Sequence, residues 1–150
     1  MNNRVNATST DSQQLGDEVL VQYRLAHLNM LQGVIGRMSG YSSSVKNFAV
    51  TIAAASLALA FDKANSLPLW IALGASSLFA ILDAYYLSKE KGFRKAYERV
   101  ARSPLQNAQD MAIKAEPAEF VSALASVSIW LFYIPLIAIS AWMICGGIPR

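Results

Sequence analysis

Three long apolar segments constrain this chain more than any other feature. They cover residues 48–61, 67–87 and 120–148, and Asp83 is the only charged residue in them. A soluble domain of this length spreads its apolar residues over amphipathic elements, whereas about twenty consecutive apolar residues are typical of a membrane-spanning helix. Charged residues make up 15% of the chain, below the roughly 25% of an ordinary soluble domain. The sequence therefore predicts an integral membrane protein with three spans.

The first two apolar segments form a predicted transmembrane hairpin over residues 44–87. The apolar block 48–61 gives only about 21 Å of helix, so it needs the preceding residues, with Lys46 reaching the interface, to cross a ~30 Å hydrocarbon core. The polar residues 62–66 then break the helix. Pro68 follows at a position that suits the first turn of a second helix.

The segment before the hairpin is predicted to hold a polar tail and one amphipathic helix. Residues 1–12 are rich in Asn, Ser and Thr and are expected to be disordered. Residues 13–40 carry an apolar stripe at helical spacing, and Gly40 is the expected stop. Such a helix lies on the membrane surface or packs against a partner helix. The stripe consists of Val21, Leu25, Leu28, Leu31, Ile35 and Met38.

The segment after the hairpin, residues 88–119, is predicted to be a basic helix followed by a polar linker. Pro104 ends the helix, and the linker holds at most a short helical turn. The third span, residues 120–148, has no charge at all, and Pro135 inside it predicts a kink. The predicted fold is thus an all-α membrane protein: an amphipathic N-terminal helix, a transmembrane helical hairpin, a cytoplasmic basic helix and a third transmembrane helix.

The basic residues predict the orientation of these spans. Four of them precede the first span and seven lie between the second and third, against only Lys63 and Arg150 on the other side. Because basic residues favour the cytoplasmic side, we expect a multi-pass membrane protein with a defined orientation. Its N-terminus lies in the cytoplasm and its C-terminus outside.

Asp83 is the candidate intramembrane polar residue. A carboxylate in a span is costly unless it pairs or meets water, so one interpretation is a pore-lining or proton-sensing group. The alternative is structural, because Asp83 lies about one turn from the cytoplasmic end of its span. There it can reach the headgroups, or pair with Lys46 or Arg37.

Small residues recur along the hairpin and are candidates for helix packing. On the second helix they repeat every four residues at Ala72, Ser76 and Ala80. Such rows let helix backbones approach closely. They indicate either packing within one chain or assembly into a homo-oligomer, and three helices per chain cannot enclose a channel alone.

Positive charge gathers on the predicted basic helix, where it suits contact with anionic lipid headgroups. No phosphate-binding loop, hydrolase motif or metal-ligand spacing occurs, and the single histidine, His27, has no second ligand near it. We therefore expect no enzyme, cofactor, metal or nucleic-acid partner. The candidate lipid-contact residues are Lys89, Lys91, Arg94, Lys95 and Arg99.

Loose motifs accompany this layout. The chain reads Leu-Asn-Met-Leu-Gln-Gly-Val-Ile-Gly-Arg-Met at 28–38, Leu-Asp-Ala-Tyr-Tyr-Leu at 82–87 and Phe-Arg-Lys-Ala-Tyr at 93–97. Over residues 20–102 it resembles small bacterial membrane proteins and is similar in layout to the SLATT-type effectors of antiphage systems. The resemblance implies that a nucleotide signal or a sensor partner triggers membrane disruption and cell death. It transfers no ligand-binding residue.

Three functions fit these observations. The first is an oligomerising, membrane-perturbing effector of an abortive-infection system. The second is a scaffold or accessory subunit without a pore, which recruits a cytoplasmic partner through residues 13–38 and 88–102. The third is a holin-like lysis protein, which the predicted cytoplasmic N-terminus fits less well.

Overall fold

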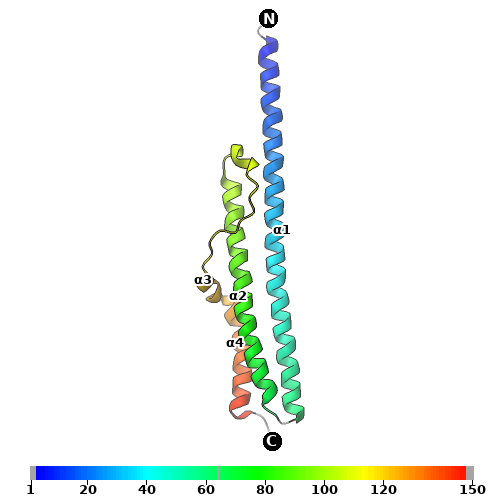
Figure 1. Ribbon diagram of the computed structural model, residues 1–150, viewed down its shortest axis with the longest axis vertical. Helices are drawn as coiled ribbons and strands as arrows, with labels where there is room; N and C mark the ends of the chain where they lie inside the picture. Colours follow the sequence, from blue (N-terminus) through cyan, green and yellow to red (C-terminus); the bar gives the residue numbers. More distant parts are fainter. Residues whose placement is uncertain (1–2, 64, 148–150) are drawn as a thin grey trace. The chain divides into compact units, whose positions relative to one another are not determined.

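The computed structural model describes the backbone of residues 3–63 and 65–147 and the side chains of residues 16–62 and 65–146. The regular elements of this part of the chain are all helices, and it holds no strand, which confirms the predicted all-α class. The chain divides into two compact units: unit 1 holds residues 1–36 and 91–117, and unit 2 holds residues 37–90 and 118–150. The elements (Figure 1) are α1 (Asn3–Lys63), α2 (Leu67–Arg102), η1 (Leu105–Gln109), α3 (Phe120–Leu124), α4 (Val127–Trp142) and η2 (Met143–Gly147).

Three helical segments are long and apolar enough to cross a membrane, as expected for a multi-pass membrane protein. They lie within Gly16–Asp62, Leu67–Arg102 and Val127–Gly146. The short apolar block of the first segment is no obstacle, because α1 continues through the polar residues before it. Residues 42–61 of this helix cover about 30 Å at 1.5 Å per residue, which matches the hydrocarbon core.

The N-terminal prediction was wrong in two respects. The segment 1–12, predicted to be disordered, is helical from Asn3 onward, and the helix predicted to stop at Gly40 runs on to Lys63. A helix that is already formed gains one hydrogen bond for each added residue. Packing also continues past the glycine, because Ile35, Ser42 and Val45 are all buried, and this outweighs the roughly 1 kcal/mol that a helical glycine costs.

The predicted apolar stripe is also only partly correct. Leu31 and Ile35 are buried, but Val21 is exposed and Leu25 is 56% exposed. The inward face is rotated toward Arg24 and His27. The reason is a polar partner that the stripe does not reveal: a terminal guanidinium nitrogen of Arg24 donates a 2.5 Å hydrogen bond to the carbonyl of Ser103, far along the chain.

Unit 2 is a bundle of the C-terminal part of α1, the N-terminal part of α2, and α4. Ala49, Ala84, Ile129 and Tyr133 form one buried cluster. A second cluster contains Ala60, Leu69 and Met143. Along α1, Ala49 of the first cluster precedes Ala60 of the second, and Tyr133 of α4 likewise precedes Met143 at the start of η2. Along α2 the order is reversed, because Leu69 of the second cluster precedes Ala84 of the first. Helices α1 and α4 therefore run antiparallel to α2, as Figure 1 shows.

The turn of the hairpin forms where the sequence predicts it. The Asn65 side chain accepts a hydrogen bond from the Leu67 backbone N–H at 2.9 Å, and the Ser66 carbonyl accepts from the N–H groups of Leu69 and Trp70. These bonds satisfy backbone donors that a helix start leaves free. Pro68 occupies the first turn of α2, as predicted.

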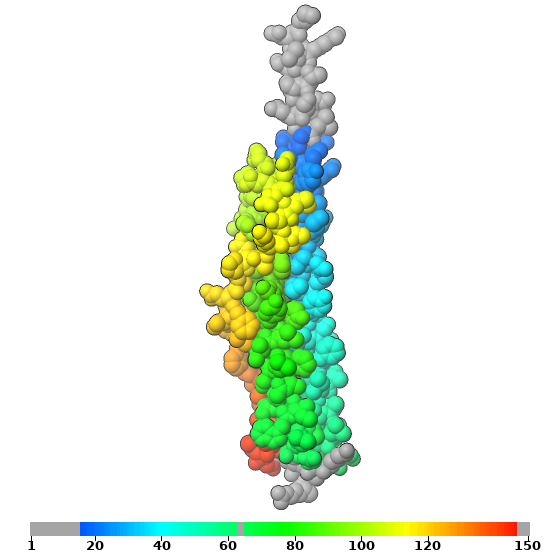
Figure 2. Space-filling view, in the orientation of Figure 1, coloured from blue at the N-terminus to red at the C-terminus, as the bar shows by residue number. Residues whose placement is uncertain are grey.

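In unit 1 the chain turns back after Arg102 and forms a return segment, residues 103–117. The segment begins with the 3-10 turn η1, and its later part lies against α2: the Glu116 N–H donates to the Gly92 carbonyl at 3.2 Å. Figure 2 shows its side chains (yellow) beside those of α1 (blue). Gly92 is required for this approach, since a Cβ atom there would lie 2.5 Å from the Glu116 carbonyl oxygen.

The third span is not one helix over 120–148, as predicted, but is divided between α3 and α4. The break lies at Ser126, whose backbone is extended and whose carbonyl accepts from the Ile129 and Trp130 N–H groups. Ser126 is the N-cap residue of α4, and it acts through its backbone, since its side chain makes no capping hydrogen bond. Pro135 lies inside α4, and the helix continues past it to Trp142.

Candidate functional site

The most distinctive polar group in unit 2 is Asp83, which is fully buried (0% exposed) on α2. Two residues of α1 hold its carboxylate. The Ser42 hydroxyl donates to Oδ1 at 2.5 Å, and the Lys46 ammonium lies 2.5 Å from Oδ2. The same ammonium donates to the Ser42 hydroxyl oxygen at 2.9 Å. The three side chains thus form a closed cluster that joins α1 to α2.

The spacing of α1 explains why these partners face Asp83. Ser42, Val45 and Ala49 are buried at successive intervals of three and four residues, so they share one face of the helix. Lys46 lies beside this face, and its side chain is only 20% exposed. Of the alternatives for Asp83, this geometry favours pairing with Lys46.

The predicted packing row on α2 lies inside unit 2. Ala72 and Ser76 are fully buried, and Ala80 packs against the cluster of Ala49, Ala84, Ile129 and Tyr133. The row therefore serves packing within one chain. A bulky substitution of Ser76 would disturb packing within the chain, so such a variant could not be used to test self-association.

A second row of small residues lies on the exposed side of α1 and was missed in the sequence analysis. Its members recur at intervals of four and three residues. Two of its side-chain hydroxyls bond back to their own helix, to the carbonyls of Gly40 and Asn47. We call this row the α1 stripe; it consists of Gly40, Ser44, Asn47, Thr51, Ala54 and Ala58.

The α1 stripe differs from the exposed surface beside it. Phe48, Leu59 and Phe61 are large and exposed on the same helix, as expected of side chains that face lipid. A Cβ atom at Gly40 would have nothing within 4 Å, so packing within the chain does not explain this glycine. The signal was present in the sequence as a repeat of small residues with an average period of 3.6 residues, that of one face of an α-helix.

The predicted lipid-contact residues have different surroundings. Lys89 lies in unit 2 with its ammonium 5.5 Å from the centre of the Tyr85 ring, and Lys95 is exposed on α2. Arg99 is engaged, because its Nε atom lies 2.6 Å from a carboxylate oxygen of Glu116 in the return segment. Further along α2, a terminal guanidinium nitrogen of Arg102 lies 3.7 Å from a carboxylate oxygen of Glu98, one turn earlier. Lys91 and Arg94 also belong to the part of α2 in unit 1.

Among the described residues, no three His, Cys, Asp or Glu side chains gather as they would around a metal ion. His27 is buried and belongs to unit 1, whereas the Asp83 cluster belongs to unit 2. No protein-family model, no curated protein and no solved structure matches this chain. Its function therefore rests on the residues described above.

Proposed function

We propose that this chain is a membrane-perturbing effector of a bacterial antiphage system, which acts by self-association in the inner membrane. The observation that carries the proposal is the α1 stripe. It presents small side chains on an exposed helix face that the chain itself leaves uncovered. The defence role comes from the resemblance of the sequence layout to the SLATT-type effectors.

Physical chemistry links the α1 stripe to self-association. Helices in lipid gain nothing from hydrophobic exclusion, so they associate where small residues let their backbones approach and where polar side chains bond across the interface. The stripe offers both, with glycine and alanine for close approach and the exposed Asn47 amide for hydrogen bonding. A second copy of α1 is the partner that the proposal requires.

Charge asymmetry supports the orientation within this proposal. Eleven of the thirteen basic residues lie before the first span or between the second and third. The positive-inside rule then places unit 1 and the N-terminus in the cytoplasm. A cytoplasmic sensor or signalling partner would reach the protein from this side.

A second candidate is a scaffold that recruits a cytoplasmic protein. One observation favours it: Val21 and Leu25, four residues apart on one face of the unit 1 part of α1, are both exposed. Apolar side chains that lie together on a water-facing helix mark interaction surfaces. Under this proposal the chain binds a heterologous partner and leaves the membrane intact.

Membrane potential after induced expression tests the proposal. We compare the wild type with Ala58→Leu, which fills the α1 stripe, and with Ala138→Leu, which places the same bulk on an exposed position of α4. The expected result is depolarisation by wild type and Ala138→Leu and none by Ala58→Leu, and crosslinking detects homo-oligomers only in the first two.

Each other outcome separates the rivals. The scaffold is favoured if none of the three proteins depolarises the membrane, even during phage infection, and if one heterologous partner is captured. Equal depolarisation by all three contradicts the role of the α1 stripe. Release of cytoplasmic enzymes along with the loss of potential indicates a holin-like protein instead.

A further inference from the structure

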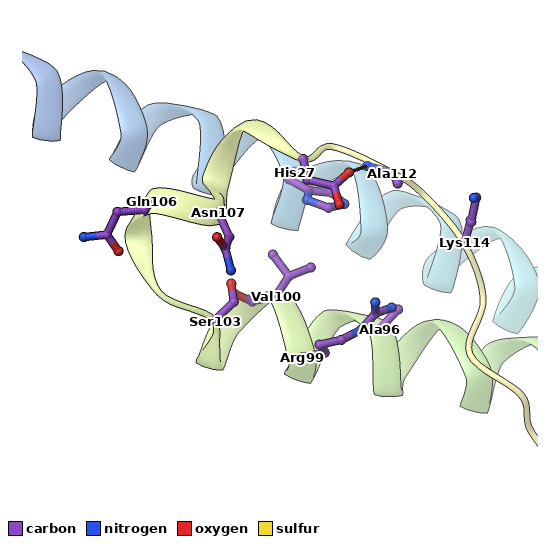
Figure 3. Close-up of a pocket in the computed structure, with 10 residues that line it drawn as sticks. His27, Ala96, Arg99, Val100, Ser103, Gln106, Asn107, Ala112 and Lys114 are labelled. Carbon is purple, nitrogen blue, oxygen red and sulfur yellow. Dashed lines mark hydrogen bonds between the residues drawn. The ribbon is translucent and has the colours of Figure 1, made fainter.

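Unit 1 contains a cavity of about 600 Å³ between α1, α2 and the return segment. Figure 3 shows His27 of α1 on one side, Val100 and Ser103 on the α2 side, and Asn107 of η1 at one end. Polar and apolar side chains share the wall about equally, so the space suits a ligand that has both a charged group and an apolar part.

His27 is the central observation. Its side chain is 2% exposed, it lines the cavity, and its Nε2 atom has no hydrogen-bond partner among the described residues. The Nε atom of Arg24, one turn earlier on the same helix, is buried without a partner too. Buried polar atoms without partners are rare in folded proteins. The Arg24 Nε–H can only donate, and His27 Nε2 donates when it carries the ring proton, so an acceptor placed in this region would satisfy both atoms.

The charged residues of the wall also indicate an acceptor that carries negative charge. Arg99 and Lys114 line the cavity as cations, against the single carboxylate of Asp110. That carboxylate already accepts a hydrogen bond from the Ala112 N–H at 3.3 Å. Glu116 contacts Arg99 at Nε, and a guanidinium carries further N–H donors whose fork geometry suits an oxyanion.

We propose that this cavity binds a small molecule through an oxyanion, either a phosphate or a carboxylate. The His27 ring and the Arg99 guanidinium donate to its oxygens, and the apolar Ala96 and Val100 line the rest of the space. The inference goes beyond the proposed function and does not depend on it. The oxyanion can belong to a soluble metabolite or to a lipid headgroup, and the experiment separates these two sources.

Since His27 is the only histidine of the chain, it provides a selective probe. The full chain carries 15N-histidine and is placed in nanodiscs of neutral lipid, and the imidazole resonances are followed during titration with pyrophosphate and, separately, citrate. A second preparation replaces a third of the lipid with phosphatidylglycerol and receives no soluble anion. A saturable shift with either soluble anion identifies a soluble ligand, and a shift with the anionic lipid alone identifies a headgroup.

Two matched variants decide whether the cavity is responsible. Arg99→Gln removes a cation from its wall and is expected to weaken binding about tenfold to a hundredfold, the usual effect of losing one charge-assisted hydrogen bond. Arg102→Gln removes a cation from the same helix outside the wall, where the side chain is 82% exposed, and is expected to leave binding within about threefold of wild type. Absence of any shift in wild type overturns the proposal. Equal weakening by both variants does so as well, because it indicates general attraction to a basic surface.

Discussion

Replacing Lys46 with methionine isolates the ion pair that joins α1 to α2. Methionine keeps most of the length and apolar character of the lysine stem, so the main change is the loss of the ammonium 2.5 Å from Asp83. The carboxylate then retains only the Ser42 hydroxyl on Oδ1. Because Asp83 has no exposed surface, water cannot replace the missing charge without opening the bundle.

The expected effects are unequal for the two partners. Breaking a buried pair so that one charge is left uncompensated costs about 3–5 kcal/mol, and we expect Lys46→Met to lie in this range. Asp83→Asn should cost less, about 1–2 kcal/mol, because the 20%-exposed lysine can turn its ammonium toward the interface. The double variant, which leaves no buried charge, should recover most of the loss.

Unfolding of the purified protein in mixed micelles, followed by tryptophan fluorescence, measures these free energies. Lys95→Met serves as the control, since Lys95 is exposed on α2 outside the cluster, and it should change the free energy of unfolding by less than about 0.5 kcal/mol. The reasoning is refuted if Lys46→Met is no less stable than Lys95→Met. It is also refuted if the double variant is as unstable as the sum of the two single variants.

Three further predictions concern other parts of the chain. Gly92→Ala should displace the return segment and raise amide exchange at Glu116, because the new Cβ atom would lie 2.5 Å from the Glu116 carbonyl oxygen. Gly36→Ala is the contrasting variant. A Cβ atom at Gly36 would have nothing within 4 Å, so this substitution should stabilise the protein by up to about 1 kcal/mol in thermal unfolding. Tyr133→Phe should leave stability in micelles unchanged within about 1 kcal/mol or raise it, because the buried hydroxyl has no partner among the described residues; a larger loss would reveal a bond to a water or lipid. Cys145, the only cysteine and exposed, should react with a membrane-impermeant maleimide in intact spheroplasts; labelling only after lysis would reverse the predicted topology.

The spans and the hairpin could be predicted from the sequence because each depends on local information. A charge-free apolar run needs no distant partner to be recognised, and the turn at residues 62–66 follows from its polar residues and from Pro68. The orientation of α1 could not be predicted in the same way. Arg24 and His27 face inward because the return segment supplies a carbonyl and a wall from nearly eighty residues away, and helical periodicity contains no trace of that contact.

The continuity of α1 was missed for a related reason. Gly33, Gly36 and Gly40 lower the intrinsic preference for helix, so local propensity predicts a stop. The packing face nevertheless keeps its intervals of three and four residues through this region, from Leu31 to Ala49. Tertiary packing decides the outcome where the two disagree, as is usual for helices in folded proteins.

The buried row of small residues on α2 and the exposed α1 stripe indicate different roles for Asp83 and for the surface proposed to self-associate. Asp83 and Ser76 lie on the buried side of α2, so a conducting path lined by the Asp83 carboxylate would require the pair with Lys46 to break, at a cost of about 3–5 kcal/mol in each chain. The α1 stripe is already exposed and carries the polar groups of Ser44, Asn47 and Thr51. The proposed function therefore requires an assembly that keeps the bundle of unit 2 intact to perturb the membrane along α1. Under the proposed function, Asp83→Asn should reduce the amount of folded protein without changing the ion selectivity of the leak, whereas substitutions at Asn47 should change the leak itself.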